Sequence, residues 1–372
     1  MKIVFIINSI SAQRCIKRVE EFINHGYDVD AYGFNRHMKT YIQPEHFSLE
    51  IIGEFSNTLP FRNRMHILLN GISKVLNRYK DNSDVYFYLF QLDVALIFRL
   101  LSHGKKYFYE ESDLMHTYIK NSLIKKSLEF VDKLIIRKSI LSIFTSEGFL
   151  IYHYGNNWPE NVCVIANRLN VNIEKVKKVN KRDFEENKLK IGFVGFPRYK
   201  SIINFINIFC SNFPNYEFHV YGEIIDKNKD YFEHLQKYQN CFFHGAFSNP
   251  KDLPQIYSNI DIVLSTYDVE YENVRYAEPN KIYEAIYFET PIIVSSGTFL
   301  EKKVQRLGIG YSVDTRNGLD VISLIRNLNF TSIEKAKDAC RKIKKSDCLN
   351  INTSFFEKIE SYFALSDSKI KL

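Results

Sequence analysis

Several features that define particular classes of protein are absent or scarce in this sequence. The chain of 372 residues contains six cysteines, and no two of them form a CxxC pair. This scatter argues against a cysteine-rich zinc site and against a disulfide framework, and it favours a reducing compartment. No apolar run approaches the length of a membrane span, and the apolar run at residues 3–7 is too short for a signal peptide.

The net charge of the chain is also only moderate. The chain has 50 lysine and arginine residues against 43 acidic residues, which gives a formal net charge of +7. Such a balance suits anionic small ligands or an anionic membrane surface as well as nucleic acid. Because there is no dense basic tract and no RNA-binding signature, we expect no nucleic acid as a partner. No GxGxxG segment follows the first expected strand, which disfavours a dehydrogenase.

The first half of the sequence alternates short apolar runs with helical patterns. Residues 3–7 form a continuous apolar run, which is typical of a strand buried on both faces, and residues 12–24 follow with helical spacing. Further strands are expected at residues 27–32, 85–90, 106–110, 143–145 and 162–166. This alternation predicts a mostly parallel sheet with helices on both faces.

The apolar signal fades over residues 171–188, which are rich in lysine, glutamate and asparagine. This stretch suits an exposed linker between domains, although a solvated helix is the alternative. The strand pattern restarts at 190–194 and recurs at 217–221, 241–244, 260–264, 291–294 and 310–313. We therefore predict an α/β fold of two doubly wound, Rossmann-like domains facing a cleft. The predicted parts are a first domain at 1–170, a linker at 171–188, a second domain at 189–345 and a helical tail at 346–372 that packs back on the first domain.

The most informative segment is residues 278–296, which predicts a polar loop, a short helix, a tight turn and a buried strand. Pro279 and Asn280 are residue types that open helices. Lys281 and Glu284 are three residues apart and therefore share one face of that helix. A cation and a hydrogen-bond acceptor near a helix start, beside unpaired backbone N–H groups, suit a phosphorylated ligand that carries hydroxyls.

The order of these features resembles that of the GT-B glycosyltransferases, most closely the retaining family-4 type that uses nucleotide-sugar donors. The sharpest likeness is the run Pro279-Asn280-Lys281-Ile282-Tyr283-Glu284 followed by residues 290–294, which is similar to the pattern "PNKLYEY…GKPVVAS". In the first half, residues 109–114 are similar to a "YExxDL" segment. The resemblance covers nearly the whole chain and implies an acceptor-binding first domain and a donor-binding second domain.

On the donor side, the resemblance implies that Glu284 accepts hydrogen bonds from ribose hydroxyls, because it matches the second glutamate of an E-x7-E motif. The alternative is a surface glutamate paired with Lys281. The first glutamate of the motif is replaced by Tyr276, and Glu278 stands close enough to take its place. Asn280 belongs to the same predicted donor site, and Gly222 and Gly245 end strands in tight turns of a kind that often contacts a nucleobase.

The diphosphate of such a donor needs positive charge around it. Arg198 and Lys200 follow the first strand of the second domain, where the resemblance places cations against the phosphates, and Lys281 is a third candidate. The alternative for Arg198 and Lys200 is two solvated charges beside a turn. Since these cations would serve the leaving group and no metal-ligand pattern is visible, we expect neither a metal nor another cofactor.

On the acceptor side, Asp113 is the main candidate, because it follows a buried strand and matches the aspartate of the "YExxDL" segment. A carboxylate there would orient an acceptor hydroxyl or the transferring sugar, and a helix cap is the alternative use. Weaker candidates are Glu110, His116, Asn8 and Ser9; a lone histidine such as His116 is more often structural.

Taken together, these expectations describe a glycosyltransferase of the hexosyltransferase type. It would move a sugar from a nucleotide-diphosphate donor to a glycan or lipid-linked acceptor, with retention, in surface polysaccharide assembly. We expect a cytoplasmic location, at the inner face of the membrane if the basic segments 61–80 and 120–138 dock on anionic lipid. The alternative for those segments is ordinary amphipathic helices. Two other functions stay open: a GT-B-shaped nucleotide-sugar epimerase, and a non-catalytic GT-B-like binding protein.

Overall fold

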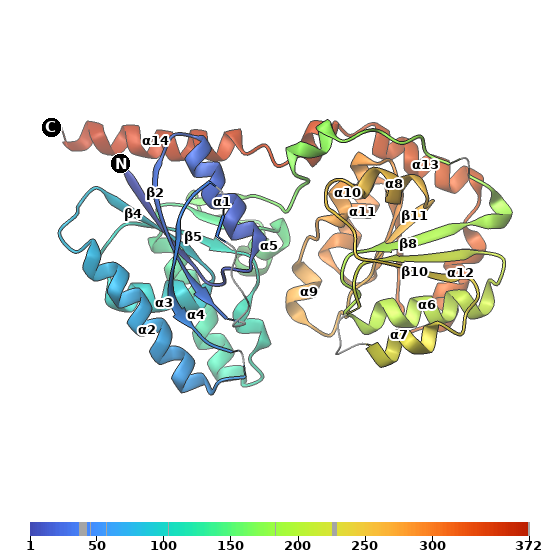
Figure 1. Cartoon of the computed structure of the whole chain (residues 1–372), viewed down its shortest axis with the longest axis horizontal. Coiled ribbons are helices and arrows are strands. Elements are labelled where there is room, and N and C mark those ends of the chain that lie inside the picture. The colour runs from blue at the N-terminus through green and yellow to red at the C-terminus, as the bar shows by residue number, and fades with distance from the viewer. Residues whose placement is uncertain are drawn as a thin grey trace. The chain divides into compact units, whose positions relative to one another are not determined.

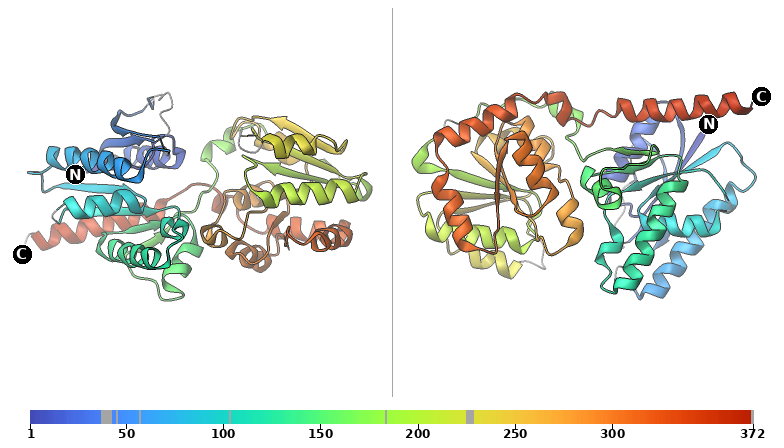
Figure 2. Two further views of the ribbon diagram at one scale, coloured as in Figure 1. Left: turned by 90° about the horizontal axis from the view of Figure 1, so that it is seen from below. Right: turned by 180° about the vertical axis from the view of Figure 1, so that it is seen from behind.

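The computed structural model describes residues 1–36, 43–44, 46–56, 58–102, 104–182, 184–224 and 229–370. The chain divides into two compact units, each an α/β domain with helices on both faces of one sheet (Figures 1 and 2). The first unit comprises Met1–Ala166 and Asn352–Leu372, and the second comprises Asn167–Ile351. No helix in the described part of the chain is long and apolar enough to cross a membrane.

The first unit contains a parallel sheet with the strand order β3-β2-β1-β4-β5-β6-β7 among the described residues. Its strands are β1 (Lys2–Ile7), β2 (Asp28–Asn35), β3 (Leu49–Glu54), β4 (Val85–Phe90), β5 (Tyr107–Glu111), β6 (Ser142–Phe144) and β7 (Val162–Val164). Its helices are α1 (Gln13–Asn24), α2 (Phe61–Arg78), α3 (Leu92–Leu101), η1 (Met115–Tyr118), α4 (Ser122–Lys138), α5 (Glu147–Tyr154) and α14 (Thr353–Ile370).

The core of this unit is aromatic and includes the end of the chain. Phe5 of β1 stacks on Tyr88 of β4 with ring centroids 4.8 Å apart, and both rings contact Phe22 of α1. The last helix, α14, adds Phe355 and Phe356 to the same cluster, at 5.9 and 5.2 Å from Phe22. The many phenylalanines and tyrosines of the sequence therefore serve packing here.

The second unit contains a parallel sheet with the strand order β10-β9-β8-β11-β12-β13 among the described residues. Its strands are β8 (Lys190–Val194), β9 (Glu217–Tyr221), β10 (Cys241–Gly245), β11 (Ile262–Ser265), β12 (Ile292–Ser295) and β13 (Gly310–Val313). Its helices are η2 (Val171–Lys175), η3 (Glu186–Lys188), α6 (Lys200–Asn212), α7 (Lys229–Leu235), α8 (Leu253–Ser258), α9 (Glu272–Tyr276), α10 (Lys281–Tyr287), α11 (Phe299–Leu307), α12 (Gly318–Asn327), α13 (Phe330–Arg341) and η5 (Lys345–Cys348).

The prediction of two Rossmann-like α/β domains with parallel sheets is confirmed, and the cleft stays a prediction. The strand β3 was not predicted, because only its first residue, Leu49, is fully buried and its other apolar residues are half-buried. The stretch 171–188 lies within the second unit, where Ile173 is buried and Arg182 pairs with Asp261 at 2.7 Å. The predicted tail is divided, since residues 346–351 belong to the second unit and α14 to the first.

Candidate functional site

In the second unit, three neighbouring strands end in glycines with positive φ. Gly195, Gly222 and Gly245 follow or end β8, β9 and β10, with φ values of 126°, 147° and 73°. The N–H of Gly195 donates to the carbonyl of Tyr221 at 2.8 Å, and the N–H of Gly222 donates to that of Gly245 at 2.7 Å. A Cβ atom on Gly222 would lie 1.9 Å from the carbonyl oxygen of Gly195. Glycine is therefore required at 222 for close backbone approach.

Lys281, the first residue of α10, reaches this glycine-lined edge of the sheet. Its ammonium lies 4.7 Å from the ring centroid of Phe193 and 5.9 Å from that of Tyr267, and 3.3 Å from the place of a Cβ atom on Gly195. The residue is only 8% exposed. In the part of the chain that the structure describes, no ion pair involves Lys281. A nearly buried cation that contacts aromatic faces and forms no described ion pair is suited to an anionic ligand.

Glu284 is buried on the same helix and does not pair with Lys281 in the described ion pairs. Its Oε2 accepts a hydrogen bond from the Tyr257 hydroxyl at 2.6 Å, and its Oε1 accepts one from the Asn280 amide at 2.7 Å. Burial raises its pKa, while Tyr257 and the nearby Lys281 oppose that rise. The surface ion pair considered as an alternative is therefore wrong. The Asn280 side chain does not cap α10, because its amide is turned towards this carboxylate.

Glu278 is buried just before α10 and is already engaged on one side. Its Oε1 accepts hydrogen bonds from the Tyr283 hydroxyl and from the Lys303 ammonium, the latter at 2.6 Å. Its Oε2 is buried and has no hydrogen-bond partner. That oxygen can accept one more donor, so the arrangement is compatible with a second ligand-binding carboxylate in place of the one lost at Tyr276.

A pocket of about 270 Å³ lies within the second unit at the carboxyl ends of β11, β12 and β13 and the start of α6. Ligands of open α/β sheets bind at such strand ends. Lys200 lines the pocket together with Ser201, Asn204, Tyr267, Asp268, Val269, Glu270, Tyr271, Ser295, Ser296, Val313, Asp314, Thr315 and Arg316.

The two predicted cations after β8 have different positions. Lys200 begins α6 and lines the pocket, whereas the exposed Arg198 places its guanidinium 5.1 Å from the ring centroid of Tyr199. The backbone N–H groups of Lys200 and Ser201 donate to the Asp268 carboxylate at 3.2 and 2.8 Å. The Asp268 carboxylate thus occupies the backbone N–H groups at the start of α6. The positive groups that a ligand can meet there are therefore the side chains of Lys200 and Arg198.

In the first unit, Glu110 is fully buried and is matched by two arginines. The Nε atoms of Arg14 and Arg18 each lie 3.0 Å from one of its oxygens, and the Tyr88 hydroxyl also donates to it. Burial alone would raise the pKa of Glu110, but Arg18, Arg14 and Tyr88 outweigh burial, so that its pKa is lowered. Since both oxygens of Glu110 face these side chains, its contacts are those of a residue that stabilises the fold.

The other acceptor-side candidates lie beyond the carboxyl ends of β1 and β5. Asn8 and Ser9 follow β1 and are half-buried; the Ser9 hydroxyl lies 2.9 Å from that of Ser11. Asp113 is half-buried after β5, and its Oδ2 lies 3.4 Å from the side-chain nitrogen of Gln91. Because the strands are parallel, all three residues stand at one edge of the sheet.

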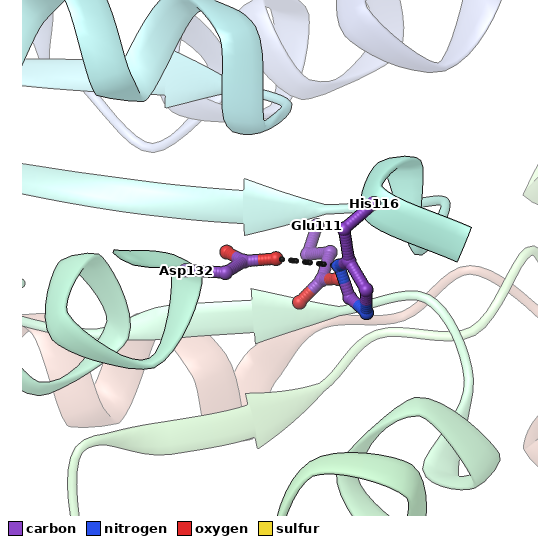
Figure 3. Close-up of side chains that lie close together, drawn as sticks. All are labelled: Glu111, His116 and Asp132. Atoms are coloured by element: carbon purple, nitrogen blue, oxygen red, sulfur yellow. Dashed lines mark ion pairs between the residues drawn. The ribbon is translucent and has the colours of Figure 1, made fainter. Parts of the chain in front are cut away.

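His116 is separate from that edge group, because it is fully buried in a cluster of polar side chains. Glu111 ends β5, His116 lies in η1 and Asp132 lies in α4, and all three point towards one another (Figure 3). His153 of α5 contacts Glu111, with its Nε2 3.0 Å from Oε2. Burial, and next the Asp132 charge, raise the pKa of Glu111 to about 8, and Glu111 in turn raises the pKa of His153 against the effect of burial.

Sequence reasoning missed both the pocket in the second unit and the two carboxyl groups that lie near His116. Asp268, Ser295 and Arg316 carry no motif, and only the rule that ligands bind at strand ends could have selected them. Glu111 stands beside the predicted Glu110, and the alternation of side chains along a strand explains why the two face different surroundings.

The two Rossmann-like domains with parallel sheets match the GT-B fold of solved glycosyltransferase structures. Residues 174–345, nearly all of the second unit, match the model of the family described as "Glycosyl transferases group 1". The second unit is therefore similar to the glycosyltransferase group 1 family over nearly its whole length.

Solved structures resemble the whole chain. Sucrose-phosphate synthase from Thermosynechococcus elongatus is 13% identical, with 98% of this chain and 100% of that chain covered and a TM-score of 0.70. The Anabaena protein Alr3699/HepE, solved in complex with UDP and glucose, is 15% identical, with 97% and 100% covered and a TM-score of 0.68. At these identities the likeness shows the fold.

A curated protein is similar to part of the chain. A protein of Klebsiella pneumoniae, described as an uncharacterized 41.2 kDa protein in the cps region, is 24% identical over 197 residues. The match covers 51% of this chain and 51% of that protein, so the chain spans about half the length of the relative.

Proposed function

We propose that this protein transfers a hexosyl group, with retention, from a nucleotide-diphosphate sugar to a glycan or lipid-linked acceptor in surface polysaccharide assembly. The observation that carries the proposal is Lys281, a nearly buried ammonium without a described carboxylate partner beside the glycine-ended strands. The group 1 family match, the UDP complex of a structural neighbour and the cps-region relative all favour this class of reaction.

The diphosphate would bind where Lys281 meets Gly195. Without a side chain at Gly195, phosphate oxygens can approach the ammonium and the backbone closely. As the bond between the anomeric carbon and the diphosphate breaks, negative charge grows on the leaving group, and a preorganised cation stabilises that charge. We propose that Lys281 has this role, aided by Lys200 and Arg198, and that no metal is needed at the diphosphate.

The nucleoside would bind through Glu284. Each of its oxygens accepts one hydrogen bond from the protein and retains capacity for a second, which two ribose hydroxyls could fill. Tyr257 and Asn280 fix the carboxylate, so that little conformational freedom is lost on binding. In the first unit, Asp113 would orient the acceptor hydroxyl whose oxygen forms the new bond to the anomeric carbon.

A lipid-linked acceptor is favoured by the surface of α4. Leu123, Phe130 and Leu134 recur at helical spacing and are 75%, 63% and 41% exposed. Basic residues accompany them on the helix, namely Lys125, Lys126, Lys133, Arg137 and Lys138. Exposed apolar side chains among cations suit the interface of an anionic bilayer. Binding to vesicles with and without an anionic phospholipid, compared with Phe130→Glu, tests this contact, which the proposed location at the inner face of the cytoplasmic membrane requires.

The central test is a thermal-shift and calorimetric titration with UDP, GDP, ADP and CDP, followed by a transfer assay with the matching nucleotide sugars. One diphosphate should bind, and Lys281→Met should weaken its binding at least about tenfold, equal to ~1.4 kcal/mol. Lys302→Met, which removes an exposed lysine from α11, should leave binding unchanged.

The outcomes separate the functions. Sugar transfer that does not depend on added Mg²⁺ supports the proposal. Binding without transfer to any acceptor would instead favour a GT-B-like binding protein, and interconversion of free nucleotide sugars would favour an epimerase. If no nucleoside diphosphate binds, the donor site is assigned wrongly.

A further inference from the structure

The buried cluster in the first unit has the composition of a metal site. Glu111, His116 and Asp132 come from a strand end, a short 3-10 helix and a long helix, and none of them is exposed to solvent. One ligand atom from each lies within 4.8 Å of those of the other two (Figure 3). Imidazole and carboxylate groups are ligands that zinc and similar divalent ions prefer in proteins.

His116 and Asp132 have atoms within the cluster that lack hydrogen-bond partners, whereas both oxygens of Glu111 contact His153 Nε2. Neither ring nitrogen of His116 has a partner, and Oδ2 of Asp132 has none. The distance between His116 Nδ1 and Asp132 Oδ2 is 3.5 Å, which is long for a hydrogen bond between these groups. Two atoms that each lie roughly 2.0–2.1 Å from one zinc ion in tetrahedral geometry are roughly 3.3–3.4 Å apart. The observed spacing therefore suits shared coordination better than a direct bond.

The two carboxyl groups of the cluster face histidines instead of permanently charged side chains. In the described part of the first unit, the neighbouring Glu110 is matched by Arg14 and Arg18, whereas no lysine or arginine forms an ion pair with Glu111 or Asp132. Enclosing two carboxyl groups in one buried space is unfavourable unless a positive charge lies between them. A divalent cation would supply that charge and would use the unpartnered atoms at the same time.

Outer hydrogen bonds hold the carboxylates in place. The Tyr109 hydroxyl donates to Asp132 Oδ1 at 2.9 Å, which leaves Oδ2 directed towards His116. His153 Nε2 lies 3.0 Å from Glu111 Oε2. Ligating carboxylates in metal sites are commonly fixed by contacts of this kind.

We propose that Glu111, His116 and Asp132 bind a divalent transition-metal ion of the zinc class, with Tyr109 and His153 as positioning residues. Since the ligands are buried, such an ion would be structural, and it would join the end of β5 and η1 to α4. It would thereby fix the loop that carries Asp113. The inference stands independently of the proposed transfer reaction.

The test uses the full chain, treated with a chelator and then supplied with Zn²⁺ or Co²⁺ alone. We expect about one equivalent of zinc per chain by elemental analysis, visible absorption bands of protein-bound Co²⁺, and a higher Tm with zinc than without it. His116→Ala should abolish the Co²⁺ bands and the zinc-dependent part of Tm. His66→Ala, which removes an exposed histidine from α2 of the same unit, should change neither.

A second variant keeps the test valid if His116→Ala fails to fold. Asp132→Asn preserves the shape of the side chain and an acceptor for Tyr109 while it removes the ligand charge, and its folding is checked by circular dichroism. Folded Asp132→Asn that binds zinc at least tenfold more weakly supports the site. Absence of stoichiometric zinc and of Co²⁺ bands in the wild-type protein would overturn it, as would equal uptake by the wild type and both cluster variants.

Discussion

The two units place charge at their strand ends in opposite ways. In the second unit, glycines remove side chains from the ends of β8, β9 and β10, and the nearby cation Lys281 has no described carboxylate partner. In the first unit, buried charges are either paired within the protein, as at Glu110, or gathered into one enclosed cluster, as at Glu111. A buried charge that is paired within the protein becomes costly when its partner is removed, whereas a buried cation without an ion pair indicates a site that a ligand completes.

The largest expected effect concerns the paired charges of the first unit. Arg18→Met should lower the free energy of unfolding by about 3–5 kcal/mol, because Glu110 would stay buried with its main counter-charge removed. Urea unfolding followed by circular dichroism measures this loss. Arg78→Met removes half of an exposed pair with Glu50 and should cost about 0–1 kcal/mol. Equal losses in the two variants would contradict the assignment of Glu110 to the core.

The next effect concerns the glycine-ended strands. Gly222→Ala should destabilise the protein by about 3 kcal/mol or more, because a Cβ would collide with the Gly195 carbonyl at a φ of 147°. Gly245→Ala is the control, since φ is 73° there and no atom lies within 4 Å of the added Cβ. Its cost should be only about 1 kcal/mol. Thermal unfolding of both variants measures the difference. A similar Tm for the two would show that close backbone approach does not require glycine at 222.

Acid should weaken the second unit through His219. Burial lowers its pKa from 6.5 to about 4, with Glu217 opposing and His244 and Lys190 adding to that shift. Between these values the unfolded chain binds more protons than the folded one, so stability falls as the pH drops from 6.5 to about 4. The loss should reach about 2–3 kcal/mol. Urea unfolding at several pH values should show a flatter profile for His219→Gln, and an unchanged profile would exclude this histidine as the cause.

The smallest of the four effects should appear in binding. Glu284→Gln keeps the size of the side chain but replaces one acceptor oxygen by a donor, so nucleotide affinity should fall roughly tenfold, or ~1.4 kcal/mol. Calorimetric titration with the diphosphate that binds the wild type gives this number. Glu233→Gln, on the exposed face of α7, is the matched control. If Glu284→Gln kept full affinity, the carboxylate would serve only its hydrogen bonds with Tyr257 and Asn280 and would have no role in nucleotide binding.

Local patterns predicted much of the secondary structure. The apolar runs of β1, β4 and β8 and the restart of the pattern in the second half were sufficient to predict two parallel-sheet domains. The strand β3 was not predicted, because partly buried strands carry a weaker apolar signal in the sequence. Lys281 and Glu284 were correctly assigned to one helix, but their separate partners, Phe193 and Tyr257, come from other elements.

The sequence by itself determined that this chain would form two α/β domains, because the period of apolar residues decides which segments become strands and helices. Only the tertiary structure decided which polar residues meet. Glu111 and His116 are close in the sequence, but they lie in different elements, and Asp132 of α4 joins them only because η1 and α4 pack beside the end of β5. It also decided that α14 completes the first unit. Contacts between distant segments depend on the packing of whole elements, which no local pattern encodes.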